Sequence, residues 1–402
     1  MTGNARILPS VLLGTAAAVL VAVGLTQLSG ARPLESLGLP DPGGLTTYGL
    51  PAVRTLTEIC AVLTVGALLT AALLTFPEAD GFLGLPGYRA LRVASYTAGA
   101  WTVGALLMIP LTIADALGRP LASVLGFGPL VAVVPRLEVA SAWLLTAVLA
   151  VVVFAGCRIA LSWGMSAVLL VVAGLGLLPV ASTGHSAAGG SHDMATDSLM
   201  LHVVAASLWI GGLVGLLGLA GSHETDRSHL AVAVPRFSRL ALLCWLVMAA
   251  SGILNALVRI PLGLVFSSGY GTLLLAKTAA LLSLGVLGYL QRRRAVPAAV
   301  EGRPGALLRL GALETLIMFA TVGLAVVLGR SAPPVQPGGL PSRNEVVLGY
   351  DLDGPPTLMR VLFDWRFDLI LGSAAIALAA LYLIGVRRLA KRGDAWARGR
   401  TA

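Results

Sequence analysis

Residues 201–213 read LHVVAASLWIGGL and place one histidine, His202, within an otherwise apolar helix. The apolar run extends over residues 197–220, and a segment of about 20 such residues crosses a hydrocarbon core of about 30 Å. His202 lies about five residues into this segment, which is about 7 to 8 Å below its boundary at a rise of 1.5 Å per residue. An ionisable side chain at that depth is costly, so it marks a candidate site.

The whole chain has the composition of an integral membrane protein. It has 402 residues, of which 57% are hydrophobic and 12% charged, whereas soluble domains carry about 25% charged residues. The mean hydropathy is +0.88. Long, uniformly apolar segments satisfy their backbone groups as helices, and the alternating pattern of a membrane β-barrel is absent.

We therefore predict an all-α, polytopic transmembrane helical bundle of about 10 spans. The first span has the length of a retained signal-anchor helix. The predicted spans are residues 9–29, 51–75, 92–114, 138–156, 164–183, 197–220, 237–258, 271–290, 306–328 and 367–386.

The distribution of basic residues predicts the orientation. With the N-terminus inside, cytoplasmic segments hold eighteen of the 28 lysines and arginines, while most acidic residues fall in the outer loops. The positive-inside rule therefore places both termini in the cytoplasm and predicts a multi-pass protein of the cytoplasmic membrane. The net charge of +9 is assigned to topology, and a nucleic-acid partner is not expected.

The spans divide into four predicted regions. Residues 1–160 form an N-terminal four-helix membrane section, and residues 164–334 a five-helix section with most of the unusual polar residues. Residues 335–366 form an extracytoplasmic Pro/Gly-rich loop. Residues 367–402 contain the final helix and a basic tail.

A second cluster of metal-binding side chains precedes the sixth span. The loop expected there carries His185, His192, Asp193 and Met194. Imidazole suits copper in both oxidation states, and thioether selects Cu(I). The three histidines, His202 included, are candidates for one outer copper site, with Met194 and Asp193 nearby. The alternatives are a solvated loop and a buried His202 that is hydrogen-bonded between helices.

Two further features belong to the second and sixth spans. Gly211 and Gly215 form a small-xxx-small pair, which lets another helix approach closely. Arg54 and Glu58 are four residues apart on one helix face, which indicates a local ion pair.

Other polar and sulfur-containing side chains within the spans predict a path. Glu314 lies about 12 Å from the cytoplasmic end of its helix, and Lys277 lies about 9 Å below the outer surface. Sulfur at helical spacing is typical of core packing. The sharper hypothesis is a translocation path from the outer histidines toward Glu314. Its candidate residues are Glu58, Cys244, Met248, Asn255, Lys277, Glu314 and Met318.

Motifs of common enzyme classes are missing from the sequence. It contains no phosphate-binding P-loop, no GxSxG elbow and no HExxH helix. We therefore expect a protein that is not an enzyme.

Four ordered segments resemble a known family. They read LHVVAASLWIGGL (201–213), PRFSRLALLCWLVMAASGILNA (235–256), GYGTLLLAKTAALL (269–282) and LRLGALETLIMFATVGLAVVLGRSAPP (308–334). They are similar to the signature segments of the copper resistance protein D (CopD) family. The resemblance implies copper uptake, or relay from an extracytoplasmic copper-binding protein, linked to resistance, homeostasis or oxidase metallation. It carries over His202 as a site residue.

The C-terminal part shows a second resemblance. LGYDLDGPPTLMRVLFDWRFD (348–368) and LYLIGVRRLAKRGDAW (381–396) look like the opening helix of a CtaG-type cytochrome c oxidase assembly domain. The sequence stops after one helix of that domain, as expected for a truncated fusion or for a tail that only anchors. Oxidase subunits are the partners that this resemblance implies.

Two other functions remain open. In a haem-binding electron-transfer protein, His185 and His202 would serve as axial ligands. In a metal-free scaffold for oxidase assembly, neither copper nor haem would be bound. Copper, as Cu(I) or Cu(II), is the leading expectation, and membrane lipid is the expected surroundings.

Overall fold

The computed structural model describes residues 7–28, 41–78, 81–183, 192–222, 227–301, 303–331 and 334. The chain divides into two compact units. The larger comprises Met1–His185 and Ser198–Gly338, and the smaller comprises Ser186–Asp197 and Gly339–Ala402. Only residues 192–197 of the smaller unit are described, and the following account concerns the larger one.

The described residues form helices joined by short connections. Nine of them are long and apolar enough to span a membrane. Ser162 and Ser268 cap two of these helices by accepting a hydrogen bond from a backbone N–H three residues on. In order, the elements are α1 (Leu8–Leu28), α2 (Gly44–Leu69), η3 (Thr70–Leu74), α3 (Leu85–Leu117), α4 (Leu121–Val124), α5 (Phe127–Val133), η4 (Val134–Arg136), α6 (Glu138–Ile159), α7 (Trp163–Gly176), α8 (Leu178–Ala181), α9 (His192–Gly221), α10 (Arg227–Arg259), η6 (Leu262–Leu264), α11 (Gly269–Leu290), η7 (Gln291–Ala295), α12 (Val296–Val300) and α13 (Gly305–Arg330).

The structure confirms an all-α, polytopic helical bundle. The first nine predicted spans each coincide with one long apolar helix. The tenth predicted span, residues 367–386, lies outside the described residues, and the orientation of the termini stays a prediction. The division into regions at about residue 160 likewise stays a prediction.

One boundary was wrong. His192, Asp193 and Met194 were expected in a loop, but α9 begins at His192. At about 1.5 Å per residue α9 is about 45 Å long, so part of it extends beyond a hydrocarbon core of about 30 Å.

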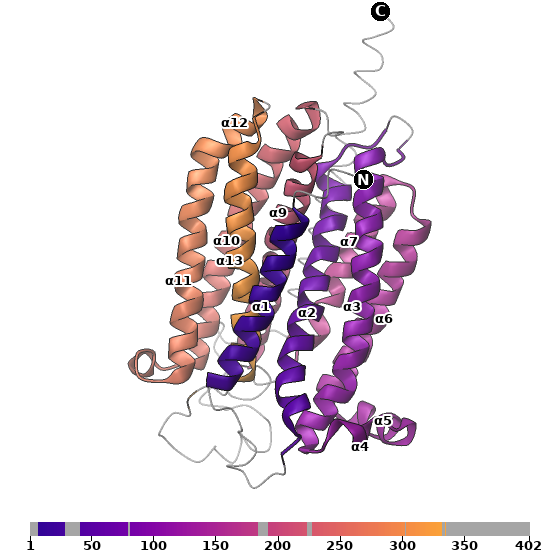
Figure 1. The fold of residues 1–402 in the computed structure, drawn as a ribbon, viewed down its shortest axis with the longest axis vertical. Coiled ribbons are helices and arrows are strands. Elements are labelled where there is room, and N and C mark those ends of the chain that lie inside the picture. Colours follow the sequence, from indigo (N-terminus) through magenta and orange to yellow (C-terminus); the bar gives the residue numbers. More distant parts are fainter. Residues whose placement is uncertain are drawn as a thin grey trace, which may run out of the picture. The chain divides into compact units, whose positions relative to one another are not determined.

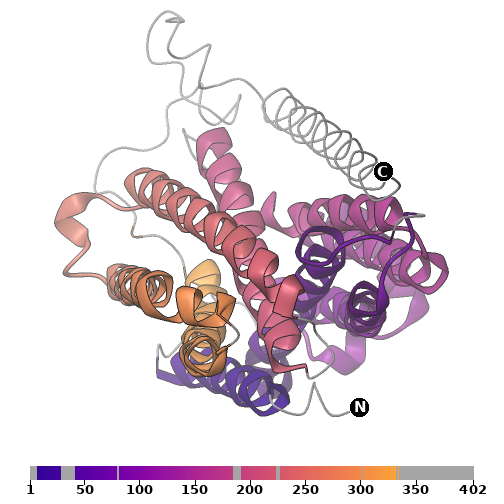
Figure 2. The ribbon, with the colours of Figure 1, turned by 90° about the horizontal axis from the view of Figure 1, so that it is seen from above.

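The larger unit contains two groups of helices that share α2 and α9. Figures 1 and 2 show α3, α6 and α7 on one side and α10, α11 and α13 on the other. Helix α1 packs along α13, where Phe319 covers Gly14. Helices α2, α6 and α11 begin at the lower end in Figure 1, and η7 and α12 lie at the upper end.

Burial differs strongly between the spans. In the most apolar window of each helix, 72% of residues are buried for α2 with η3 and 61% for α9, but only 11% for α10 and 6% for the span of α11. Helices α2 and α9 therefore form the centre of the packing. Most residues of α10 and α11 are partly buried or exposed. In a membrane, lipid would cover their apolar side, and lipid is as apolar as a protein core.

The two central helices meet backbone to backbone. A methyl group added at Gly211 would lie 2.8 Å from the Cα atom of Gly66 and closer still to the carbonyl oxygen of Val62. A methyl group at Gly215 would overlap the hydroxyl of Thr70. The small-xxx-small prediction is confirmed, and α2 is the helix that approaches.

Helix α2 ends in a π-helical turn, η3, which changes its backbone hydrogen bonding. The N–H of Thr75 donates to the carbonyl of Thr70 over 3.0 Å, five residues back. Trp163 Nε1 of α7 donates to the carbonyl of Ala72 over 2.7 Å. The carbonyl of the next residue, Leu73, accepts from Arg236 of α10 over 3.3 Å. The π turn thus joins both groups of helices at the upper end.

The glycine contact predicts a steric effect. We expect Gly211→Ala to lower the free energy of unfolding by about 2 kcal/mol or more, because α2 must move to make room for the methyl group. Thermal unfolding of the purified protein in detergent measures this. The control is Gly218→Ala on the same helix, where the nearest neighbour, Ile7, lies at 3.4 Å. Equal melting temperatures for the two variants would contradict a tight α2–α9 contact.

Candidate functional site

His202 lies between α9 and α10, and its ring is hydrogen-bonded across the helix interface. Its Nδ1 is 3.1 Å from the hydroxyl oxygen of Ser251, which in turn donates to the carbonyl of Met248 over 3.3 Å. The same carbonyl is a hydrogen-bonding neighbour of the imidazole. The ring also lies beside Gly252 of α10, where an added methyl group would be 3.8 Å from the ring carbon Cε1. Nδ1 is therefore engaged, and Nε2 is the nitrogen that the Ser251 contact leaves for a ligand.

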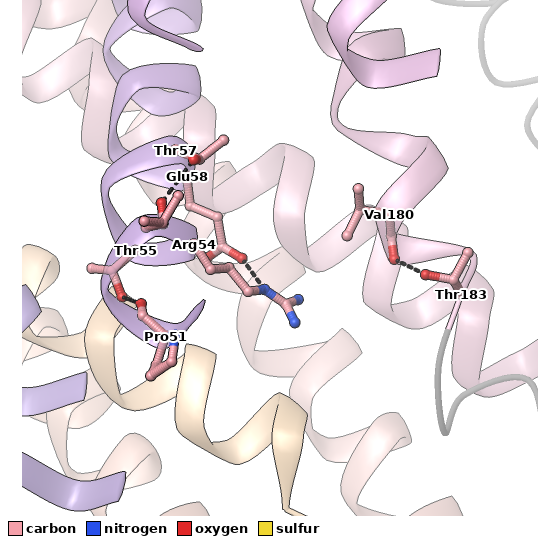
Figure 3. Close-up of polar contacts among 8 residues, drawn as sticks. Pro51, Arg54, Thr55, Thr57, Glu58, Val180 and Thr183 are labelled. Atoms are coloured by element: carbon pink, nitrogen blue, oxygen red, sulfur yellow. Dashed lines mark hydrogen bonds and ion pairs between the residues drawn. The ribbon is translucent and has the colours of Figure 1, made fainter. Parts of the chain in front are cut away.

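A cation of α11 acts on this position, and a carboxylate of α2 acts on that cation. The ammonium group of Lys277 interacts electrostatically with both His202 and Glu58. Glu58 also accepts a hydrogen bond from Arg54 Nε over 2.9 Å, so the predicted local ion pair is confirmed. Figure 3 shows both side chains running along α2, with the guanidinium end projecting away from the helix. Lys277 of α11 thus acts on the imidazole, and Glu58 of α2 acts in turn on Lys277.

Asn255 extends the polar cluster by one helical turn along α10. Its amide nitrogen donates to the hydroxyl of Ser198 on α9 over 3.2 Å. Ser198 and Ser251 are both buried, at 4% exposure each. The α9–α10 interface is therefore polar over the turns that contain His202, and it is apolar beyond, where Leu213 and Phe237 belong to the main core cluster.

The donors around His202 do not by themselves complete a copper site. Among the described residues, no group of three or more His, Cys, Asp or Glu side chains could hold a metal ion. The ring is accompanied by a hydroxyl and a carbonyl, which are poor ligands for Cu(I), and by a lysine cation. His202 alone therefore fits one ligand of a transient or shared site.

The other predicted metal ligands are not placed by the structure. His185 lies outside the described residues, and so do the side chains of His192, Asp193 and Met194 in the first turn of α9. Convergence of these groups on copper, and the axial haem pair of His185 with His202, both stay predictions. His229, at the opposite end of the bundle, contacts Phe76 in a tilted arrangement, with ring centroids 5.4 Å apart.

A second buried polar group lies toward the end of the bundle that holds η7 and α12. Glu314 on α13 is 3% exposed, and its Oε1 has no hydrogen-bond partner. The side chain of Gln291 is its hydrogen-bonding neighbour. Gln291 begins the π-helical turn η7 and is buried, whereas the three arginines that follow are exposed. A buried carboxyl group of this kind needs a proton, a cation or a polar path.

The predicted sulfur-containing residues belong to one cluster. Cys244 and Met318 are buried members of the main core, and Met248 packs against it. Met318 follows Glu314 by one turn on α13, and Met248 follows Cys244 by one turn on α10. This arrangement satisfies ordinary core packing, and it also places thiol and thioether groups on the two helices that carry Ser251 and Glu314.

Three hydrogen-bonding partners of the candidate site residues were not predicted from the sequence. Ser251 and Ser198 are single hydroxyls within apolar helices, and only the pairing of α9 with α10 makes them partners of His202 and Asn255. Gln291 precedes an arginine run and was included in the cytoplasmic segment. The only sequence signal for Gln291 was its place as an uncharged polar residue directly before three arginines.

Fold and site together define a polytopic helical membrane protein with isolated polar groups between its core helices. The Copper resistance protein D family model matches residues 231–328. The model of the Copper resistance protein D-like, N-terminal domain matches residues 45–193. Together they cover more than half of the sequence, and the chain belongs to the copper resistance protein D family.

Relatives are found in mycobacteria and in Bacillus. The chain is 30% identical over 389 residues to the uncharacterized protein Mb0105 of Mycobacterium bovis, which covers 97% of this chain and 56% of that protein. It is 27% identical to ML1998 of Mycobacterium leprae over the same shares. It is 33% identical over 115 residues to the copper transport protein CutJ of Bacillus subtilis, covering 28% of this chain and 21% of CutJ.

The chain thus spans about half the length of the mycobacterial relatives that it matches. No solved structure matches it. The second resemblance, to a CtaG-type domain, lies in residues outside the described part and stays a prediction.

The burial of the Glu314 carboxyl group predicts that two substitutions of this residue change the free energy of unfolding differently. Glu314→Gln preserves the shape and removes the charge, so we expect the free energy of unfolding to stay within about 1 kcal/mol or to rise. Glu314→Ala opens a cavity in the core and should cost about 2 to 4 kcal/mol. Thermal unfolding in detergent compares the two variants. Equal losses would mean that the carboxylate has a strong partner that Gln cannot replace.

Proposed function

We propose that this protein transports or relays copper at the cytoplasmic membrane and is not an enzyme. Membership of the copper resistance protein D family carries this proposal, and the polar cluster at His202 supports it. Copper is the substrate that passes through. Uptake, homeostasis or resistance, with supply to oxidase assembly, are the biological outcomes that such a protein would serve.

The proposed orientation has both termini in the cytoplasm. The helices alternate in direction through the nine described spans, and His202 and Lys277 each lie about two turns from the start of their spans. The positive-inside count then assigns this end to the extracytoplasmic side. His202 would accept copper from that side, and Glu314 would lie on the cytoplasmic half of the route.

Capture of copper is assigned from the sequence to His185, His192, Asp193 and Met194. These groups would take the ion from water or from an extracytoplasmic copper-binding protein. His202 would receive it next through its free ring nitrogen. The lysine cation near this ring favours release over retention, because like charges repel in a medium of low dielectric constant. A relay needs such weak binding at each step.

The inward route is assigned to the sulfur-containing residues and Glu314. Met248 and Cys244 lie successively farther along α10 from Ser251. Met318 of α13 belongs to the same core cluster, and Glu314 lies buried one turn before it on that helix. Thioether and thiol groups bind Cu(I) without adding charge. A carboxyl group at the end of the route can accept a cation or exchange a proton with it.

The central test replaces His202. We expect His202→Asn to abolish copper-dependent accumulation in cells, measured as cellular copper against the amount of protein in the membrane. Asparagine retains a polar group that can hydrogen-bond to Ser251, so the protein should still fold. It lacks the imidazole nitrogen that would bind copper, so the variant tests copper binding alone. The matched control is His229→Asn at the opposite end, which should accumulate copper like the wild type. Normal accumulation in the His202 variant would overturn the proposed relay.

The sulfur route has its own test. Met248→Leu conserves volume and apolarity but removes the thioether, so stability should change by less than about 1.5 kcal/mol while the copper uptake rate falls severalfold. The control is Met108→Leu, a buried methionine of α3 in a separate core cluster. Unchanged uptake in the Met248 variant would restrict this residue to packing.

A further inference from the structure

A polar cavity of about 300 Å³, partly open to the protein surface, lies between α3 and α6, and the arginines and tyrosines that line it are exposed. It is lined by Tyr88, Arg92, Ser95, Tyr96, Cys157 and Arg158. Two guanidinium groups and two phenol groups therefore face one space, and no carboxylate is among the lining residues. The family assignment and the copper route do not use this cavity.

The hydrogen-bonding groups of the cavity are incompletely used. Ser95 is one of the lining residues and is 3% exposed, and its buried hydroxyl oxygen has no hydrogen-bond partner. A buried hydroxyl without a partner costs free energy, so a ligand that accepts its proton would be favoured. Within the described part of the chain, Arg92 and Arg158 form no ion pair, and Arg92 donates only to the phenol oxygen of Tyr96 over 3.4 Å.

The lining residues lie near the ends of their helices. Arg92 lies about two turns into α3, and Arg158 is in the last turn of α6. Helix α3 has 33 residues, which is about 50 Å, so its ends extend past a hydrocarbon core of about 30 Å into the headgroup region. Exposed tyrosines such as Tyr88 and Tyr96 are typical of that depth.

We propose that this cavity binds a phosphate group and that an anionic phospholipid supplies it. The two guanidinium groups would bind the phosphate oxygens, as arginine does in fork-shaped pairs, and the Ser95 hydroxyl would donate a further hydrogen bond. The position at the headgroup level favours a lipid over a soluble anion. By the positive-inside rule this is the cytoplasmic leaflet, where basic residues meet anionic lipids.

The test counts lipids that stay bound to the purified full chain. Native mass spectrometry after mixing with phosphatidylglycerol or phosphatidylcholine should show selective retention of phosphatidylglycerol by the wild type. Each of Arg92→Ala and Arg158→Ala should weaken retention about fivefold, and the double variant should lose most of it. Ser95→Ala should weaken it severalfold with both charges intact.

The control for charge is Arg309→Ala, an exposed arginine near the start of α13 that donates to the carbonyl of Gly305 in its own helix. It should bind phosphatidylglycerol like the wild type. A large excess of inorganic phosphate distinguishes the sources. Displacement of the lipid identifies soluble phosphate as a second ligand of the site, and retention identifies the headgroup alone. Equal retention by the double variant and the wild type, or an equal loss in Arg309→Ala, would overturn the proposal.

Discussion

The close contact of α2 with α9 is the constraint on which the remaining structure depends. Because Gly66 and Gly211 have no side chains, two backbones approach to a distance that other residues would prevent. Both helices are then largely buried, and α1, α3, α7 and α13 pack against α2. The contact also fixes α9 in rotation. His202, nine residues before Gly211, therefore faces α10.

The peripheral helices complete the polar cluster without being buried themselves. Ser251 and Asn255 come from α10 and Lys277 from α11, the two spans with the least buried windows. Ser251 and Asn255 form hydrogen bonds with α9, and Lys277 interacts electrostatically with His202. Hydrogen bonds within hydrocarbon are worth about 1 kcal/mol each, so α10 is held at this level by several weak interactions. That suits a route on which the substrate must bind and leave.

The sequence allowed much of the fold to be predicted, because its signals are local. Nine apolar runs matched nine helices, the Gly211–Gly215 spacing indicated a close helix contact, and the i, i+4 spacing gave the Arg54–Glu58 pair. The partners across helices were not predictable. Ser251 bonds His202 only because α10 lies beside α9, and periodicity within one helix does not name its neighbour. The start of α9 was misplaced because hydropathy marks where hydrocarbon begins, whereas the helix continues into the polar region.

The π-helical turn at Gln291–Ala295 shows that chain length can matter as much as composition. A π turn holds one more residue than an α-helical turn of the same rise. Successive residues in an α-helix are about 100° apart, so deleting one residue here would rotate everything before the turn relative to α12 by about that angle. Gln291 would then no longer face Glu314, although both residues would still be present. The direction of the Gln291 side chain thus depends on the number of residues in the turn, and substitutions, which leave that number unchanged, would not reveal this dependence.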